Sequence, residues 1–328
     1  MKTEKAALVL ACIAVVIGIG STNGPVKKML AQLKPQTELA VWGGTAAEPK
    51  DDLRTSIEVK AAKLNSPPID ATVDRVWKAI PGYNGLEVDV EATYRNAQLA
   101  GPNAGLKLLY RQIKPEISLN DLGAQPIYRG NPAKPMVSLM INVAWGNQYI
   151  LPMLDILDQE KVKVTFFLDG SWLSHNKELA AEMLKRGHEM ENHAYTHPNM
   201  STLSRARATA EIQKTQNLLK ESLGVTNTWF APPSGDFDQE TVDIAASLGL
   251  KTVLWTLDTV DWRNPSPDSI ITKISSKIEP GSLVLMHPTA SSSKALQGMI
   301  RGIKAKGLQL GTVSQTLSAE RVLPPDVE

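Results

Sequence analysis

From residue 135 onward, apolar runs typical of buried strands alternate with stretches of helical periodicity, and this pattern constrains the fold more than any other feature. A strand that returns to its sheet through a helix runs parallel to the preceding strand. The sequence therefore predicts an α/β protein with a parallel sheet of about seven strands, open or closed into a barrel. The predicted strands cover 136–144, 162–168, 188–192, 228–231, 251–257, 282–286 and 308–313, and the predicted helices 148–160, 176–186, 204–222, 239–248, 267–278 and 292–305.

The N-terminal residues have the layout of an export signal. Lys2 and Lys5 precede an uncharged run of 15 residues, 6–20, and a transmembrane helix needs roughly 17–25 residues. A basic start and an apolar stretch predict that residues 1–20 are a signal peptide, or an uncleaved membrane anchor, because no Ala-x-Ala cleavage site follows. We therefore expect an exported protein, either secreted or held at the membrane by its N-terminus.

The segments between this signal and the predicted sheet lack a catalytic pattern. Residues 21–68 are mixed and polar, without a sustained period, and are predicted to be a linker or stalk. Residues 69–130 are predicted to form a small α+β module, because a Pro-Gly-Tyr-Asn-Gly turn at 81–85 precedes strict alternation over 86–91. We expect this module to have a structural role, or to dock against the cell wall or a partner.

Charge and cysteine content exclude two classes of protein. The chain has 35 Lys and Arg against 34 Asp and Glu, a net charge of +1. Nucleic-acid binders normally show a basic excess, so we expect no nucleic-acid partner. The single cysteine, Cys12, lies in the apolar N-terminal run. This excludes disulfides within the chain and zinc sites built on cysteine.

Polar and aromatic residues gather directly after the predicted strands. In a parallel barrel, such residues meet at the edge formed by the C-terminal ends of the strands. We therefore expect a functional site there. The five segments are, in chain order, Asn-Val-Ala-Trp-Gly at 142–146, Asn-His-Ala-Tyr-Thr-His-Pro at 192–198, Phe-Ala-Pro-Pro-Ser-Gly at 230–235, Asp-Thr-Val-Asp-Trp at 258–262 and Leu-Met-His-Pro at 285–288.

These ordered segments resemble the five motifs of the polysaccharide deacetylase family, the NodB-homology or carbohydrate esterase 4 group, over residues 133–320. The segment 75–85 narrows the resemblance to the sporulation-associated, YlxY-like branch. The resemblance implies a distorted parallel (β/α) barrel as the fold. It also implies an enzyme activity that removes acetyl groups from peptidoglycan or chitin-like sugars and uses a divalent metal, usually zinc. It also implies a cell-wall glycan as partner, and the cell wall or spore envelope as the location.

The first and third motifs depart from the family pattern. Where the family carries two aspartates, a base and a metal ligand, this chain has Ala144 and Trp145. The arginine that orients the base is replaced by Ala231. Catalytic zinc needs three protein ligands, and water activation needs a base within hydrogen-bond reach. The departures therefore predict weak or no turnover.

The remaining motifs are intact. His193 and His197 match two metal ligands, and Asp261 and His287 match the carboxylate and imidazole of the general acid. A carboxylate partner holds an imidazole in one tautomer. Two histidines alone are also compatible with loop residues fixed by hydrogen bonds, so present-day zinc binding stays open.

Other residues near these motifs are candidates for binding. Trp145, Trp262 and Pro232 are candidate substrate contacts, although Trp145 as a core residue would instead fill part of the cleft. Glu191 is the first carboxylate expected near the metal position, because it shares a strand face with His193. The alternative is that Glu191 pairs with a lysine or points to solvent. Residue Asp169, after the second predicted strand, is the next candidate.

Two functions are consistent with this pattern. The first is an exported glycan-binding pseudoenzyme that keeps the fold and the cleft. The second is a working metal-dependent N-deacetylase, a hydrolase of non-peptide carbon–nitrogen bonds, with a rebuilt site. The absence of the base, the third ligand and the arginine favours the pseudoenzyme.

Overall fold

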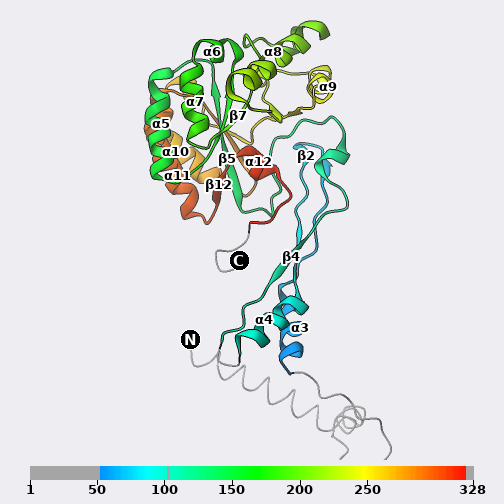
Figure 1. The fold of residues 1–328 in the computed structure, drawn as a ribbon. Helices are drawn as coiled ribbons and strands as arrows, with labels where there is room; N and C mark the ends of the chain where they lie inside the picture. Colours follow the sequence, from blue (N-terminus) through cyan, green and yellow to red (C-terminus); the bar gives the residue numbers. More distant parts are fainter. Residues whose placement is uncertain (1–51, 102–103, 323–328) are drawn as a thin grey trace, which may run out of the picture. The chain divides into compact units, whose positions relative to one another are not determined.

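The computed structural model describes residues 52–101 and 104–322, which all belong to one compact unit, Asp51–Glu328 (Figure 1). The predicted signal or anchor at 1–20 and most of the predicted linker lie outside the described residues. Within the described part of the chain, no helix has the length and hydropathy needed to span a membrane.

A parallel sheet lies at the centre of the described chain, as the alternation of strands and helices predicts. Its strand order is β10-β11-β5-β6-β7-β8-β9, and β12 pairs with β5. All of these pairs are parallel. Strand β5 is buried along almost its whole length, as in sheets covered on both faces. The strands are β5 (Met136–Val143), β6 (Thr165–Leu168), β7 (Glu189–Asn192), β8 (Trp229–Phe230), β9 (Lys251–Thr252), β10 (Leu257–Asp258), β11 (Leu283–Met286) and β12 (Gln309–Gly311).

Helices cover this sheet and bury their apolar faces on it. Helices α5, α10 and α11 pack side by side (Figure 1). Leu154 of α5 and Leu296 of α11 belong to the same buried cluster as Ile141 of β5. The helices are α5 (Asn147–Gln159), α6 (Gly170–His175), α7 (Lys177–Lys185), α8 (Arg205–Leu223), α9 (Gln239–Ser247), α10 (Pro267–Lys277), α11 (Ala290–Ala305) and α12 (Val313–Leu317). Six of these were predicted from the sequence, and the short α6 and α12 were not.

The prediction of a single strand at 251–257 is wrong, because residues of the N-terminal part interrupt it. Leu254 N donates to Ile127 O at 2.7 Å, and Thr256 Oγ1 donates to Tyr128 O at 2.7 Å. On its other side, Arg129 forms an antiparallel bridge with Ser282. Residues 127–130 therefore lie between β9 and the start of β11, and β9 and β10 are two separate short strands.

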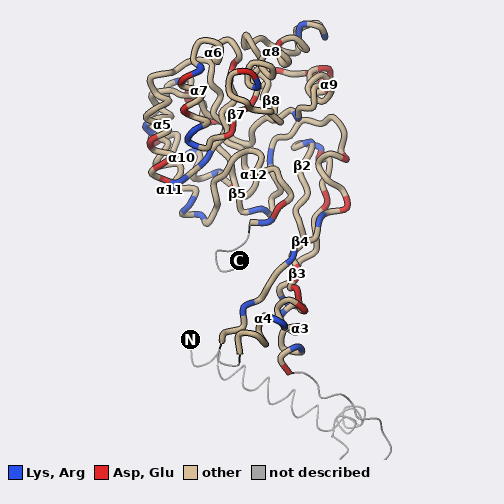
Figure 2. The backbone as a smooth tube through the Cα atoms, in the orientation of Figure 1, with Lys and Arg blue, Asp and Glu red and all other residues tan. Residues whose placement is uncertain are grey.

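The N-terminal module contains two antiparallel strand pairs and two helices. Strand β3 pairs with β4, and β1 with β2. Figure 2 shows the acidic and basic residues of β3 and β4 close together, where Glu87 and Arg111 form an ion pair of 2.9 Å. The elements are α3 (Asp52–Leu64), β1 (Thr72–Asp74), β2 (Lys78–Ile80), β3 (Gly85–Val88), α4 (Val90–Ala100) and β4 (Tyr110–Ile113).

The predicted linker at 21–68 ends too late in the sequence. Ile57 and Ala61 of α3 are buried against Val88 of β3, and Ser66 forms a bridge with Leu86. Residues 52–68 are therefore part of the module. Helix α3 has a weak apolar periodicity, and it gains its burial from packing on β3 rather than from its own pattern.

Candidate functional site

The polar motifs converge at the C-terminal ends of the parallel strands, as predicted. Trp145 follows β5, His193 follows β7, and His287 follows β11. Burial, together with the neighbouring charges of His197 and His287, lowers the pKa of His193 to about 3. The two halves of the predicted site therefore lie close enough to interact electrostatically.

Asp261 and His287 form a buried hydrogen-bonded pair. His287 Nδ1 lies 2.8 Å from Asp261 Oδ1, and His287 N donates to Asp261 Oδ2 at 2.6 Å. Ser292 Oγ, in the first turn of α11, donates to the same Oδ2. Burial by itself raises the pKa of Asp261, but these hydrogen bonds outweigh it, and the net pKa is lowered. Because an ionised carboxylate only accepts hydrogen bonds, the proton of the neutral imidazole lies on Nδ1.

The indole of Trp145 stacks on the imidazole of His287. The ring centroids are 5.4 Å apart, and the planes differ by 15°. Gly146 brings the two together, because its φ of +87° turns the chain so closely that a Cβ there would lie 2.0 Å from Pro288 O. Trp145 nevertheless stays 46% exposed. It is therefore not a core residue, and it covers His287 while presenting surface to solvent.

His193 and His197 lie at the two ends of a short, tightly held loop. Their ring centroids are 5.1 Å apart. His193 Nδ1 donates to Ala231 O at 2.7 Å, so the lone pair of the neutral ring lies on Nε2. Glu211 of α8 fixes the loop by accepting hydrogen bonds from the backbone N–H groups of Tyr195 and Thr196. The intact second motif therefore keeps its geometry.

Asp169 faces this histidine pair from the end of β6. Burial raises its pKa, and the nearby charge of His197 acts in the opposite direction. One carboxylate oxygen, Oδ1, caps α6 by accepting from Trp172 N at 2.8 Å and from Ser171 Oγ at 2.6 Å. Of the two carboxylates considered from sequence, Asp169 is thus the one that interacts electrostatically with His197.

Glu191 has a structural environment instead. It is 3% exposed, and its Oε2 accepts from Thr228 N at 2.9 Å and Trp229 N at 2.7 Å, at the start of β8. Neither a lysine nor solvent is its partner, so the expectation of such a partner is wrong. Burial, together with the charge of Glu189, raises the pKa of Glu191 to about 9.

The three predicted substrate contacts differ in exposure. Trp262 is 54% exposed, and Arg263 Cζ lies 4.6 Å from its ring centroid. Trp145 is also exposed, as described above. Pro232 is buried at the end of β8, and its contact with substrate stays a prediction. Two exposed indoles therefore flank the Asp261–His287 pair.

The donor set does not fit a resident catalytic zinc. Among the described residues, no group of three or more His, Asp, Glu or Cys side chains could hold a metal ion. Ala144 is partly exposed at the position where the family has its base, and Ala231 is fully buried. Catalytic zinc sites supply three protein ligands and an open position. His193 and His197 supply two.

Sequence reasoning missed Ser292 and Glu211, which hold the site in place. Both lie on helices, at positions where a serine in a first turn or a glutamate on a polar face carries no distinguishing signal.

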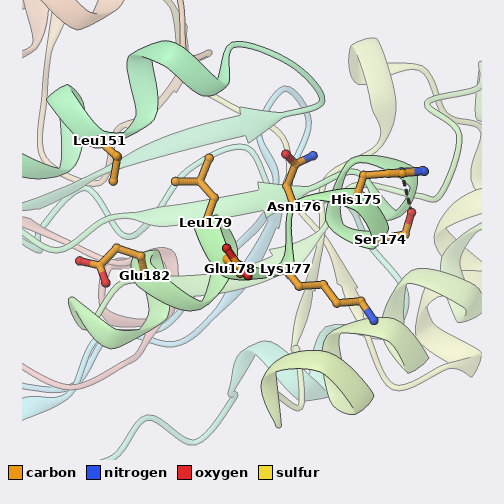
Figure 3. A pocket seen from close by; sticks show the side chains of 8 residues that line it. All are labelled: Leu151, Ser174, His175, Asn176, Lys177, Glu178, Leu179 and Glu182. Atoms are coloured by element: carbon orange, nitrogen blue, oxygen red, sulfur yellow. Dashed lines mark hydrogen bonds between the residues drawn. The ribbon is translucent and has the colours of Figure 1, made fainter.

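A cavity of about 690 Å³ also lies away from the motifs (Figure 3). Its lining residues come from α5, from α6 and α7, and from the junction between α6 and α7. They include Leu151, His175 and Glu182.

Comparison with known proteins agrees with these motifs. A family model described as polysaccharide deacetylase matches residues 129–253. The chain is 44% identical over 279 residues to the uncharacterized protein YlxY of Bacillus subtilis, covering 85% of this chain and 88% of that protein. The chain belongs to the polysaccharide deacetylase family. It is also 29% identical over 191 residues to a peptidoglycan-N-acetylglucosamine deacetylase of Bacillus cereus, covering 57% of this chain and 70% of that protein.

Solved structures of this family match both the fold and the sequence. The structure of a CE4 family pseudoenzyme from Bacillus anthracis has a TM-score of 0.77 and 42% identity, over 83% of this chain and 97% of that one. A mutant of that pseudoenzyme, described as having restored enzymatic activity, also has a TM-score of 0.77, with 41% identity over 83% of this chain and 100% of that one. The parallel half-barrel is thus the NodB-type fold that the motifs imply.

Proposed function

We propose that this chain is an exported, glycan-binding member of the polysaccharide deacetylase family that binds N-acetylated cell-wall glycan with little or no turnover. The observation that carries the proposal is the stack of Trp145 on His287. An indole occupies the position of the family's metal-binding carboxylate and covers the ring that would act as general acid.

The loss of chemistry follows from what the site lacks. No base stands at Ala144, and the described residues offer no three-ligand metal cluster. General acid–base catalysis is worth about 10²–10⁴ in rate, and the incomplete metal site removes a further contribution. We infer that His193 and His197 do not hold zinc tightly enough to restore turnover.

Glycan binding is supported by the two exposed indoles beside the intact Asp261–His287 pair. Trp145 and Trp262 are 46% and 54% exposed. An aromatic face offers apolar contact area, and its stacking contacts are worth about 0.5–1.5 kcal/mol beyond area burial. The B. cereus relative is named for a deacetylase of peptidoglycan N-acetylglucosamine, which supports an N-acetylated glycan as the ligand.

Calorimetry with N-acetylglucosamine oligomers tests the proposal. We expect the wild type to bind them and the Trp145→Ala variant to bind about 3- to 10-fold more weakly, the loss of one stacking contact. Leu99→Ala removes an 88% exposed apolar side chain on α4 and is the matched control, with unchanged binding expected. Absence of binding by the wild type would contradict the proposal.

Acetate release separates the pseudoenzyme from the working deacetylase. With zinc added, we expect no release from oligomers or peptidoglycan by the wild type. An Ala144→Asp, Trp145→Asp double variant restores both carboxylates and uncovers His287, and it should bind zinc more tightly than the wild type. Acetate release by the wild type at the rates of active relatives would establish the hydrolase instead.

The proposed location is outside the cytoplasmic membrane, and the proposed setting is sporulation. The location is supported by Lys2, Lys5 and the uncharged run at 6–20, and the setting by the resemblance to the YlxY-like branch. Cell fractionation through growth and sporulation tests both. Recovery of the chain in the cytosol with an intact N-terminus would contradict export.

A further inference from the structure

A second cavity, of about 370 Å³, lies between the N-terminal module and the last helix of the barrel. It is lined by residues from three segments, 81–84, 114–120 and 317–320. None of the motif residues lines it, and no part of the proposed glycan function uses it. Pockets of roughly 300–1,000 Å³ at the junction of two substructures are the usual place for small ligands.

The walls of this cavity are fixed by hydrogen bonds and close packing. Asn84 N donates to Ala319 O at 2.7 Å, which joins two of the lining segments. Lys134 Nζ donates to Ser318 O at 2.9 Å and Ser318 Oγ at 3.1 Å, which fixes the 317–320 segment a second time. A Cβ at Gly82 would lie 2.8 Å from Ile69 O, so the Pro-Gly-Tyr-Asn-Gly turn fits only with glycine there. The cavity is therefore preformed.

Exposed polar side chains of opposite charge line the cavity. In the described chain, Lys114, Asn120 and Glu320 form no side-chain hydrogen bond or ion pair, although the charge of Glu320 acts on Lys134, where it opposes the lowering of the lysine's pKa by burial. Lys114 and Glu320 come from different segments and form no ion pair with each other. The apolar side chains of Leu119 and Leu317 also line the cavity. The cavity thus combines a cation, an anion and an apolar surface.

We propose that this cavity binds a small zwitterionic ligand, an amino acid or the terminus of a short peptide. Its carboxylate pairs with Lys114 and its ammonium with Glu320. Its apolar side chain packs on Leu119 and Leu317, and Asn120 supplies a further hydrogen bond. Hydrogen bonds to charged groups are stronger than those between neutral groups, so the two contacts favour a molecule that carries both charges.

Calorimetry on the full chain tests this proposal with four probes: glycine, leucine, phenylalanine and the dipeptide Leu-Leu. We expect leucine or phenylalanine to bind more tightly than glycine, because of the apolar wall. The uncharged derivative N-acetyl-leucine amide should not bind. Preferential binding of Leu-Leu over leucine would identify a peptide terminus as the ligand. Failure of all four probes at millimolar concentration, or equal binding of the uncharged derivative, would overturn the proposal.

Charge-neutralising variants locate the binding to this cavity. We expect Lys114→Gln and Glu320→Gln each to lower the affinity about 10-fold or more. Lys107→Gln and Glu221→Gln change exposed residues that do not line the cavity, and are the matched controls with unchanged affinity expected. If all four variants bind equally well, the ligand lies elsewhere and the proposal fails. Trp145→Ala should leave this binding unchanged, so its result is independent of the glycan proposal.

Discussion

At the scale of single residues, one side chain has two effects on the site. Trp145 stands where the family has a metal-binding carboxylate, and its ring also covers His287. Restoring a carboxylate at position 144 alone would therefore leave His287 covered. The pair of Asp261 and His287 keeps its hydrogen bonds beneath the indole, because those bonds depend on β11 and α11 rather than on the residues that were lost.

Glu191 gives a prediction for stability against pH. Its pKa of about 9 lies well above the ordinary value of 4.5, because of burial and the charge of Glu189. Between these values the folded chain keeps a proton that the unfolded chain releases, so stability falls as the pH rises from 4.5 towards 9. Glu191→Gln keeps an oxygen for Thr228 N and Trp229 N and removes this loss. We expect the variant to be about 1–3 kcal/mol more stable at pH 8 in urea unfolding.

Two comparisons check the cause of that gain. The advantage of the variant should shrink at pH 5, because this pH lies only slightly above the ordinary pKa of 4.5 and little of the pH-dependent loss has accumulated there. Glu221→Gln changes an exposed residue of α8 and should have little effect at either pH. A variant less stable than the wild type at pH 8 would mean that Glu191 is ionised and held by its two backbone donors.

At the scale of elements, the turn from β5 into α5 positions Trp145. Gly146 has a φ of +87°, and a Cβ there would lie 2.0 Å from Pro288 O. We expect Gly146→Ala to lower the free energy of unfolding by about 3 kcal/mol or more, from backbone strain and the clash together. It should also separate the indole from His287, which a change in tryptophan fluorescence would detect.

Gly249 is the matched control for that turn. Its φ is +79°, but nothing lies within 4 Å of a Cβ there. Gly249→Ala should therefore cost only the strain of the left-handed backbone, about 1–2 kcal/mol. Equal losses in the two variants would contradict the close approach of Gly146 to Pro288.

The sequence was enough to predict the central strands and most helices, because their apolar residues follow local periods. It was not enough where partners distant in the chain decide the structure. The run 251–257 has a strand pattern, but Ile127 and Tyr128 take its hydrogen bonds. The apolar residues of helix α3 follow only a weak helical period, and the helix is stabilised by packing on Val88.

The candidate site was predictable to a similar extent. The motif spacing placed His193, His197, Asp261 and His287 correctly at the strand ends. It could not show that Trp145 would stack on His287, because that contact depends on the conformation of Gly146. It also pointed to Glu191 before Asp169, because strand alternation gives the face of a side chain but not the backbone donors that it meets.

At the scale of the whole described chain, Arg321 ties the C-terminal segment to the N-terminal module. Its guanidinium lies 4.7 Å from the ring centroid of Tyr83, and Nη1 donates to Ser66 Oγ at 2.8 Å and Asn84 O at 3.3 Å. We expect Arg321→Ala to lower the free energy of unfolding by about 1–2 kcal/mol. Limited proteolysis should then cleave more readily between residues 66 and 84.

Arg301 on α11 provides the comparison for that substitution. It pairs with Glu160 at 2.9 Å, and its side chain is 65% exposed. Exposed ion pairs are worth about 0–1 kcal/mol, and this one does not join the module to the barrel. Arg301→Ala should therefore leave the cleavage pattern unchanged. If both variants gave the same pattern as the wild type, the contacts of Arg321 would not hold the two parts together.

The place of residues 127–130 has a consequence for synthesis of the protein on the ribosome. This segment is made before the barrel, yet Arg129 Nη2 donates to Pro280 O, 151 residues later in the chain. At about 5–20 residues per second, the segment emerges roughly 8–30 seconds before its second partner. Its backbone groups stay exposed to water and to other chains for that interval. The gap between β9 and β11 is therefore among the last to close, and a slow codon run before residue 280 would lengthen the interval in which the nascent chain can aggregate.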